Sequence, residues 1–396
     1  MRLGVDATGW SNKRGYGRFT RGLLHAVVAL DRRNSYVFFV DSGEQLFELP
    51  QGVEVVSVPA RVPAVQAASA RGRRSLRDLW TIGRMVAQQR LDAVFFPSVY
   101  TFFPIPSRVP KLVTIHDTFP EMFPQLVFPT RAARFFWKSK VFLSRLQADL
   151  ILTVSEYSRR CLTQYLGISP ARTRVVEEAG DPVFQPLVEP DCNGLMTRYG
   201  MAACDPFVLY VGGFSPHKNL SMLLEVFQTL LADARLRNLR LVLVGDCTGD
   251  PFYSCYPELR EKVAAAGLDA RVVFTGFVPD SELVCLLNLA RVVVLPSFAE
   301  GFGLPAIEAA SCGTPVVATT ASPLPELLGE GGLYVSPTDR PGLLAALTRV
   351  LTDRELHRRM SKAALQAARR LTWENSARRL LSIFEEVAGH RHGETT

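Results

Sequence analysis

The sequence predicts an α/β protein of two doubly wound domains, each a parallel sheet with helices on both faces. Three observations predict it. Short apolar runs bounded by turn residues alternate with helical patterns along the whole chain, which is typical of consecutive βαβ units. A stretch rich in proline and polar residues, 181–193, interrupts this alternation and predicts a domain boundary. A chain of 396 residues is long enough for two separate cores.

The first domain is expected to span residues 1–184. An apolar helix is expected from 18 to 30, and further helical patterns separate most of the strands. The predicted strands are 2–8, 36–40, 53–59, 93–98, 111–117 and 150–155. Ligands of such sheets bind beyond the carboxyl ends of the strands. His116 and Asp117 stand at such an end and are candidate site residues, although a lone pair of this kind is usually structural.

Gly15 and Gly17 follow the first strand, before the helix from 18 to 30. Glycines in this place let a backbone loop approach a ligand closely. No third glycine completes a dinucleotide-binding fingerprint, so a plain turn explains the pair equally well. Ser155, after the sixth strand, is expected to cap the helix that follows it.

The segment 130–147 predicts a helix that carries basic side chains on one side and aromatic side chains on another. Thr130 is its expected N-cap. Basic and apolar side chains recur at helical spacing: Arg131, Arg134, Lys138, Arg145, Phe135, Phe136, Phe142 and Leu146. The helix can rest on an anionic membrane surface, or it can be a solvated face over a core. The cluster 71–74 can extend such a basic patch or be a mobile loop.

The second domain is expected to span residues 185–371. Helices are expected at 283–289 and 341–351. The predicted strands are 207–213, 241–246, 272–276, 292–297, 315–320 and 333–336. After the first of them comes the loop 212–219, which leads into a further apolar helix. Lys218 at that loop–helix junction can hold a phosphate as a compact cation, or it can be a surface lysine in a turn.

The stretch 291–313 carries the most specific signal, because it predicts a strand, a glycine-rich loop and a short helix. Pro305 suits the first helical turn and Gly313 suits a left-handed C-terminus. The free N–H groups of the helix N-terminus carry roughly half a positive charge and suit a phosphate. Glu300 and Glu308 flank that site and would accept hydrogen bonds from ligand hydroxyls. Alternatively, Glu300 is a solvated loop residue and Glu308 an exposed helix residue.

The cysteine spacing and the charge distribution limit which class of protein this chain can belong to. The seven cysteines are scattered and never spaced C-x-x-C, which favours reduced cytoplasmic thiols over disulfides or a structural zinc site. No signal sequence or membrane-spanning run is expected. The net charge of +7 is uneven, since residues 1–184 hold 25 Lys and Arg against 15 Asp and Glu. That excess can serve solubility alone, or it can suit an acidic acceptor, an anionic membrane or nucleic acid. No basic and aromatic recognition module supports nucleic acid.

Together these motifs resemble glycosyltransferase family 4, the retaining transferases of the two-domain GT-B fold. E-G-F-G-L-P-A-I-E at 300–308 is the most specific match. Supporting matches are T-I-H-D-T-F-P at 114–120, T-V-S-E-Y-S-R-R at 153–160, P-H-K-N at 216–219 and G-Y-G-R-F-T at 15–20. The resemblance implies two Rossmann-like domains facing across a cleft. It also implies that a helix at 372–390 returns to the first domain. The tail at 391–396 is polar and is expected to be disordered.

The resemblance also implies roles for individual residues. Glu308 would accept from ribose hydroxyls, Glu300 would contact the donor sugar, and Lys218 would hold the diphosphate. His116 would touch the sugar from the other domain, and Phe277 would lie beside the nucleobase. The residues implied in catalysis are Glu300, His116 and Lys218. Those implied in donor binding are Gly15, Gly17, Asp117, Gly213, His217, Phe277, Gly301, Phe302, Gly303, Leu304 and Glu308.

The function implied is retaining transfer of a hexose, mannose from GDP-mannose, to a saccharide or lipid-linked acceptor in cell-surface polysaccharide or glycoconjugate synthesis. No D-x-D sequence is present, so no metal and no other cofactor is expected. The expected location is cytoplasmic, with peripheral contact to an anionic membrane and no nucleic-acid partner. One departure is that Gly213 and His217 occupy positions where the family places an arginine. An inactive nucleotide-sugar-binding protein of the same fold is the alternative.

Overall fold

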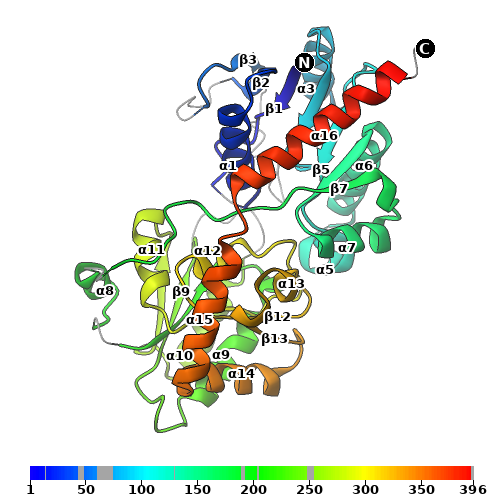
Figure 1. The fold of residues 1–396 in the computed structure, drawn as a ribbon. Coiled ribbons are helices and arrows are strands. Elements are labelled where there is room, and N and C mark those ends of the chain that lie inside the picture. Colours follow the sequence, from blue (N-terminus) through cyan, green and yellow to red (C-terminus); the bar gives the residue numbers. More distant parts are fainter. Residues whose placement is uncertain are drawn as a thin grey trace. The chain divides into compact units, whose positions relative to one another are not determined.

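The computed structural model describes residues 1–13, 15–42, 49–59, 75–128, 130–188, 192–202, 205–247 and 254–393. The chain forms two compact units (Figure 1). Unit 1 comprises Met1–Glu178 with Thr372–Thr396, and unit 2 comprises Ala179–Leu371. The first crossing between them therefore follows Glu178, ahead of the expected boundary after Phe184. The basic cluster at 71–74 lies outside the described residues.

Unit 1 is built on a seven-stranded parallel sheet in the order β3-β2-β1-β4-β5-β6-β7. The strands are β1 (Arg2–Asp6), β2 (Ser35–Asp41), β3 (Glu54–Val58), β4 (Ala93–Phe96), β5 (Lys111–Thr114), β6 (Leu150–Thr153) and β7 (Thr173–Val175). The helices are α1 (Gly15–Leu30), α3 (Leu76–Gln88), α4 (Phe119–Met122), α5 (Pro124–Val127), α6 (Arg131–Gln147), α7 (Glu156–Leu166) and α16 (Trp373–Gly393). The strand order reverses between β1 and β4, as in doubly wound folds.

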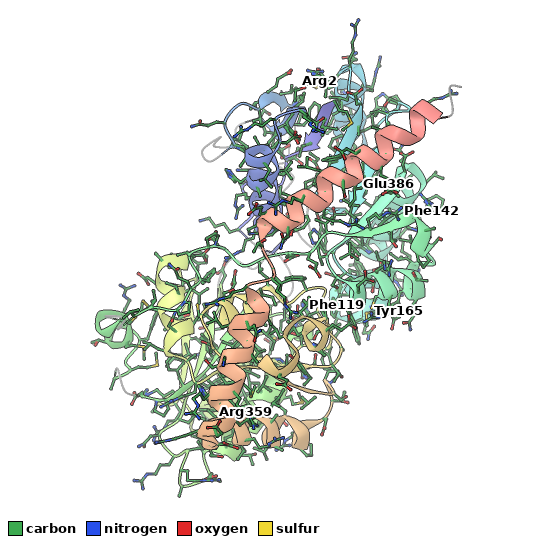
Figure 2. All side chains as sticks on the ribbon, in the orientation of Figure 1. Arg2, Phe119, Phe142, Tyr165, Arg359 and Glu386 are labelled. Atoms are coloured by element: carbon green, nitrogen blue, oxygen red, sulfur yellow. The ribbon has the colours of Figure 1, made fainter. Side chains whose placement is uncertain are left out.

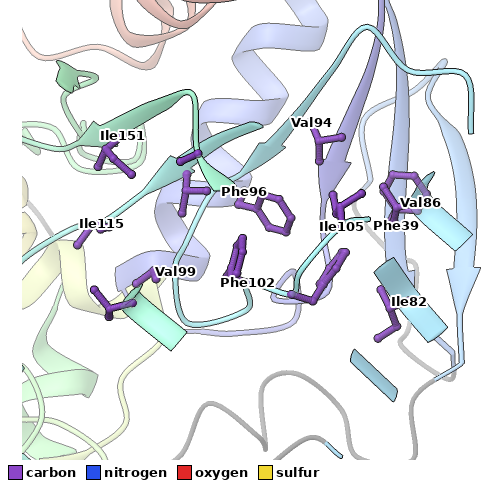
Figure 3. Packing of buried hydrophobic residues seen from close by; sticks show 14 of the residues in the cluster. Phe39, Ile82, Val86, Val94, Phe96, Val99, Phe102, Ile105, Ile115 and Ile151 are labelled. Carbon is purple, nitrogen blue, oxygen red and sulfur yellow. The ribbon is translucent and has the colours of Figure 1, made fainter. Parts of the chain in front are cut away.

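The core of unit 1 is apolar and largely β-branched or aromatic. Figure 3 shows Phe39, Val94 and Phe96 from the sheet packed with Ile82 and Val86 of α3, and all five are buried. The Phe96 ring lies 5.0 Å from that of Phe102 and 5.1 Å from that of Phe103, in tilted and edge-to-face arrangements. Runs that are apolar at every position, such as 93–96, belong in a sheet covered on both faces.

The carboxyl-terminal helix α16 docks on α1 within unit 1 (Figure 1). The indole of Trp373 fills the space beside Gly22, where a Cβ atom would lie 2.4 Å from the ring. Glu386, labelled in Figure 2, pairs with Arg174 of β7. The helix runs from Trp373 to Gly393, so it begins one residue after the expected start and continues into the stretch expected to be a tail.

Unit 2 repeats the same topology with six parallel strands in the order β10-β9-β8-β11-β12-β13. The strands are β8 (Phe207–Val211), β9 (Arg240–Val244), β10 (Val272–Gly276), β11 (Val292–Leu295), β12 (Val316–Thr319) and β13 (Gly332–Val335). The helices are α8 (Asn193–Arg198), α9 (Leu220–Leu230), α10 (Tyr256–Ala265), α11 (Asp280–Leu289), α12 (Leu304–Ser311), α13 (Leu324–Leu328), α14 (Arg340–Thr352) and α15 (Arg354–Ala368).

The prediction of two doubly wound α/β domains is confirmed. Every predicted strand is present, and Thr130 and Ser155 cap α6 and α7 by accepting from Ala133 N and Ser158 N. Several predicted strands were too long at their carboxyl ends; β4 ends at Phe96 rather than Ser98, and β5 ends at Thr114 rather than Asp117. β7 and α15 were not predicted. Among the described residues, no helix combines the length and the apolar character that spanning a membrane would need.

Candidate functional site

The loop between β11 and α12 lies at the place where the strand order of unit 2 reverses. β11 pairs with β8, so the loops that follow these two strands start side by side. Gly303 adopts the left-handed conformation with φ of 86° and ends the loop, and Pro305 lies in the first turn of α12. The predicted left-handed Gly313 has φ of 79°. The sequence therefore folds locally as expected, with a helix N-terminus at the switch point of the sheet.

Glu300 is held in this loop by two side chains. Its Oε1 accepts from Lys218 Nζ at 2.7 Å and from Ser297 Oγ at 2.6 Å. The side chain of Glu300 is 14% exposed and that of Lys218 is 20% exposed, so the pair is shielded from solvent. The interpretations of Glu300 as a solvated loop residue and of Lys218 as a surface lysine are therefore wrong. Residues 82 positions apart in sequence form one ionic contact.

Glu308 is buried on α12, at 2% exposure. A Cβ atom added at Gly180 would lie 3.8 Å from Glu308 Cγ, so the segment at Gly180 packs beside this side chain. Burial, and then the charge of Glu308, raise the pKa of the Cys312 thiol to about 12. The interpretation of Glu308 as an exposed helix residue is wrong. A carboxylate buried in this way is an acceptor, which is the chemistry that a ligand hydroxyl needs.

The loop after β8 is fixed by Asn219, which follows the 3₁₀ turn Pro216–Lys218. Asn219 is left-handed, with φ of 56°. Its Nδ2 donates to Pro296 O at 3.2 Å and to Pro337 O at 2.9 Å. A further backbone bond joins Phe298 N to His217 O at 2.9 Å. These contacts tie the loop of Lys218 to the loop of Glu300, and the sequence offered no pattern that would show them.

His217 stands where the resemblance would place an arginine. Burial, and then the positive charge of Lys218, hold the pKa of His217 well below its usual value. The imidazole is therefore neutral at pH 7 and adds no positive charge to this loop. Gly213 of the same loop accepts from Tyr210 Oη at 2.6 Å through its carbonyl oxygen. Lys218 is thus the cation of this loop.

The remaining residues predicted in unit 2 differ in how far their side chains are exposed. Phe302 and Leu304 are buried, at 3% and 8% exposure, so only their backbone groups are suited to a ligand. Phe277 follows β10 and is 62% exposed. Gly301 lies in the loop before Gly303. Contact of any of these residues with a donor stays a prediction.

His116 of unit 1 follows β5 and is 9% exposed. Its Nε2 lies 3.0 Å from Pro97 O, and its Nδ1 lies 3.3 Å from Glu178 Oε1. The Phe19 ring packs on it edge to face, with 4.9 Å between the ring centres. Both ring nitrogens therefore have partners inside unit 1. Glu178 was missed, because a glutamate in a linker sequence carries no signal of its own.

Asp117 accepts from Phe119 N at 2.9 Å and so stabilises the start of α4. Gly15 and Gly17 lie in the first turn of α1. A Cβ atom at Gly17 would lie 1.9 Å from Asn12 O, whereas one at Gly15 would meet nothing within 4 Å. Gly17 therefore allows α1 to pack closely against the backbone at Asn12. Of the two glycines, Gly15 is the one that faces open space.

Replacing Gly17 with alanine is expected to destabilise unit 1 by about 1–3 kcal/mol, because the methyl group would overlap a backbone carbonyl. Gly15→Ala is the matched control and is expected to keep the wild-type Tm or to raise it slightly. Thermal unfolding followed by circular dichroism measures both. Equal Tm values for the two variants would contradict the close contact.

Comparison with known proteins gives the family. The family models Glycosyl transferases group 1 and Glycosyltransferase Family 4 match residues 198–367 and 15–182. O-antigen chain mannosyltransferase B of Escherichia coli is 31% identical over 72% of this chain and 72% of its own length. The serotype-specific mannosyltransferase WbdA of Escherichia coli is 27% identical over 61% of this chain, which spans 29% of that longer protein.

Solved structures agree on the fold. Sucrose-phosphate synthase of Thermosynechococcus elongatus superposes with a TM-score of 0.77 at 19% identity, covering 98% of this chain and all of that one. Anabaena HepE in complex with UDP-glucose superposes with a TM-score of 0.71 at 20% identity, covering 99% of this chain and all of HepE. The chain therefore belongs to glycosyltransferase family 4, and its two parallel-sheet domains are those of the GT-B fold.

Proposed function

We propose that this glycosyltransferase moves a hexose, with retention of anomeric configuration, from a nucleotide diphosphate sugar to a saccharide or lipid-linked acceptor in polysaccharide synthesis. The ionic contact between Lys218 and Glu300 at the switch point of unit 2 carries the proposal. The cation can bind the diphosphate of a sugar nucleotide, and the carboxylate can accept hydrogen bonds from the hydroxyls of its sugar. The mannosyltransferase relatives support mannose as the transferred sugar, and GDP is the nucleotide that the sequence resemblance implies.

The proposed reaction breaks the bond between the anomeric carbon and the diphosphate oxygen, and it forms a bond from that carbon to an acceptor oxygen on the same face. Negative charge grows on the leaving diphosphate, which Lys218 and the N-terminus of α12 would stabilise. The acceptor's proton passes to a leaving phosphate oxygen, so no protein base is required. Because no D-x-D sequence is present, a carboxylate-bound metal is not part of the proposal.

Donor specificity is tested by thermal unfolding of the whole protein with UDP-, GDP-, ADP- and TDP-sugars, each with and without magnesium. A ligand that binds the folded state alone raises Tm. The expected result is a shift with GDP-mannose that does not need magnesium, followed by mannosyl transfer with retained configuration by NMR. No shift and no transfer with any nucleotide sugar would contradict the proposed function.

An inactive nucleotide-sugar-binding protein is the second candidate, and the neutral His217 favours it, since Lys218 is then the one cation of its loop. Neutralisation of the leaving diphosphate would be weaker than with an added arginine. Ligand-induced stabilisation without turnover in the same assays would support this candidate over the transferase.

We also propose peripheral contact of unit 1 with an anionic membrane through α6. The rings of Phe135 and Phe142 are 68% and 60% exposed, and Leu146 is 68% exposed (Figure 2 labels Phe142). Exposed Arg131 and Arg134 lie on the same helix. Apolar rings beside cations match the boundary between lipid headgroups and acyl chains. A cytoplasmic location stays a prediction, made from the scattered cysteines.

Replacing Phe135 and Phe142 together with serine is expected to reduce sedimentation with vesicles that contain phosphatidylglycerol, because both rings would lose their buried contact with lipid. Trp80→Ser is the matched control, since this ring on α3 is 55% exposed and lies outside α6. It is expected to leave binding unchanged. Equal sedimentation of the wild type with neutral and anionic vesicles would contradict membrane contact.

A further inference from the structure

The two oxygens of the Glu300 carboxylate have different surroundings. Oε1 takes both hydrogen bonds, from Lys218 and from Ser297. In the part of the chain that the structure describes, no donor bonds Oε2. A carboxylate oxygen can accept more than one hydrogen bond. Oε2 is therefore the atom through which Glu300 can accept from a ligand hydroxyl without disturbing the existing contacts.

Lys218 has a single ionic partner among the described residues, which is Glu300. A phosphate that draws Lys218 toward itself therefore takes positive charge away from Glu300. Because the two side chains are only 20% and 14% exposed, water compensates poorly for that loss. A ligand that carries only phosphates thus competes with Glu300 for Lys218. A ligand that also carries a hydroxyl-bearing sugar returns a hydrogen bond to Glu300.

We propose that the Lys218–Glu300 pair makes this site discriminate between a nucleotide sugar and the sugar-free nucleoside diphosphate, with Ser297 as the positioning residue of Glu300. The inference rests on the proposed function and deepens it. Its consequence is that transfer of the sugar removes the compensating hydroxyls, so the nucleoside diphosphate product is held less tightly and leaves.

Ser297 is suited to the positioning role by its own contacts. The residue is fully buried, its hydroxyl donates to Glu300 Oε1, and its carbonyl oxygen accepts from Thr319 Oγ1 at 2.8 Å. The backbone of Ser297 is thus anchored to β12 independently of any ligand. When Lys218 moves toward a phosphate, the Ser297 hydroxyl continues to donate to Oε1 and so holds the carboxylate in its orientation.

The test compares affinities for GDP and GDP-mannose by isothermal titration calorimetry in the wild type and in Glu300→Gln. Glutamine keeps the shape and accepts from Ser297, but it does not neutralise Lys218. GDP is expected to bind the variant about tenfold more tightly, and the preference for GDP-mannose over GDP is expected to fall by at least that factor. Unchanged GDP affinity with an unchanged preference would overturn the inference.

Ser297→Ala separates positioning from folding. This variant is expected to bind GDP-mannose about tenfold more weakly than the wild type does. Its affinity for GDP is expected to stay within about twofold, because GDP has no mannose to contact Glu300. Ser322→Ala is the matched control, a buried serine whose hydroxyl donates to Thr319 O at 2.6 Å rather than to Glu300. Equal weakening of GDP and GDP-mannose in Ser297→Ala would overturn the positioning role. Wild-type protein that binds neither ligand would instead overturn the proposed function.

Discussion

Replacing Lys218 with alanine is expected to lower kcat for sugar transfer by about 10²- to 10³-fold, because a fixed charge on the leaving diphosphate acts mostly in the transition state. The neutral His217 beside it cannot take over this charge at pH 7. Steady-state kinetics with labelled GDP-mannose measure the loss. The accompanying change in KM is expected to be smaller.

The control for this prediction is Lys262→Ala. Lys262 is an exposed lysine of α10 in the same unit, and its Nζ donates to Ser221 Oγ at 2.9 Å. The Lys262→Ala substitution removes the same single positive charge from unit 2, and it lies outside the loops after β8 and β11. The control is expected to keep wild-type kcat. Similar losses in both variants would show that net charge, and not the position of Lys218, supports catalysis.

The second large effect is expected at Asn219. Asn219→Ala removes two hydrogen bonds to the carbonyl oxygens of Pro296 and Pro337, and it places alanine at φ of 56°. Lost hydrogen bonds and left-handed strain together cost about 2–4 kcal/mol. A domain of this size loses roughly 2–4 °C in Tm for each kcal/mol. Calorimetric scanning should therefore place the unit 2 transition well below that of the wild type.

Asn219→Gly separates the two causes of that loss. Glycine accepts the left-handed conformation but lacks the amide, so its Tm is expected to lie between those of the wild type and Asn219→Ala. Transfer activity is expected to fall in both variants, because the loop that carries Lys218 loses its connection to the loop of Glu300. Wild-type Tm in Asn219→Gly would show that the amide contributes only through backbone conformation.

Most of the fold could be predicted because βαβ units have a local signature. Runs such as 93–96 are apolar at every position, which shows where a buried strand lies. Strand ends were harder, because apolar residues such as Ile115 continue past β5 into a buried loop. β7 has three residues and packs at the sheet edge, which leaves too short a pattern to recognise.

The candidate site could be predicted only in part. Glu300, Glu308 and Lys218 stand in motifs that the sequence displays. The contacts of Ser297, Asn219 and Glu178 join segments far apart in the chain, so no local pattern reveals them. Burial was also hidden, since the local sequence of α12 allows Glu308 to face solvent, whereas the folded chain leaves it only 2% exposed. Tertiary packing decides both points.

The most direct measurement is a crystal structure of the protein with GDP-mannose bound. We expect the diphosphate to lie at the N-terminus of α12, within hydrogen-bond distance of Lys218 Nζ. We also expect a mannose hydroxyl to donate to Glu300 Oε2 while Ser297 Oγ continues to donate to Oε1. A diphosphate bound away from the loops after β8 and β11, with the contact between Lys218 and Glu300 intact, would contradict these expectations.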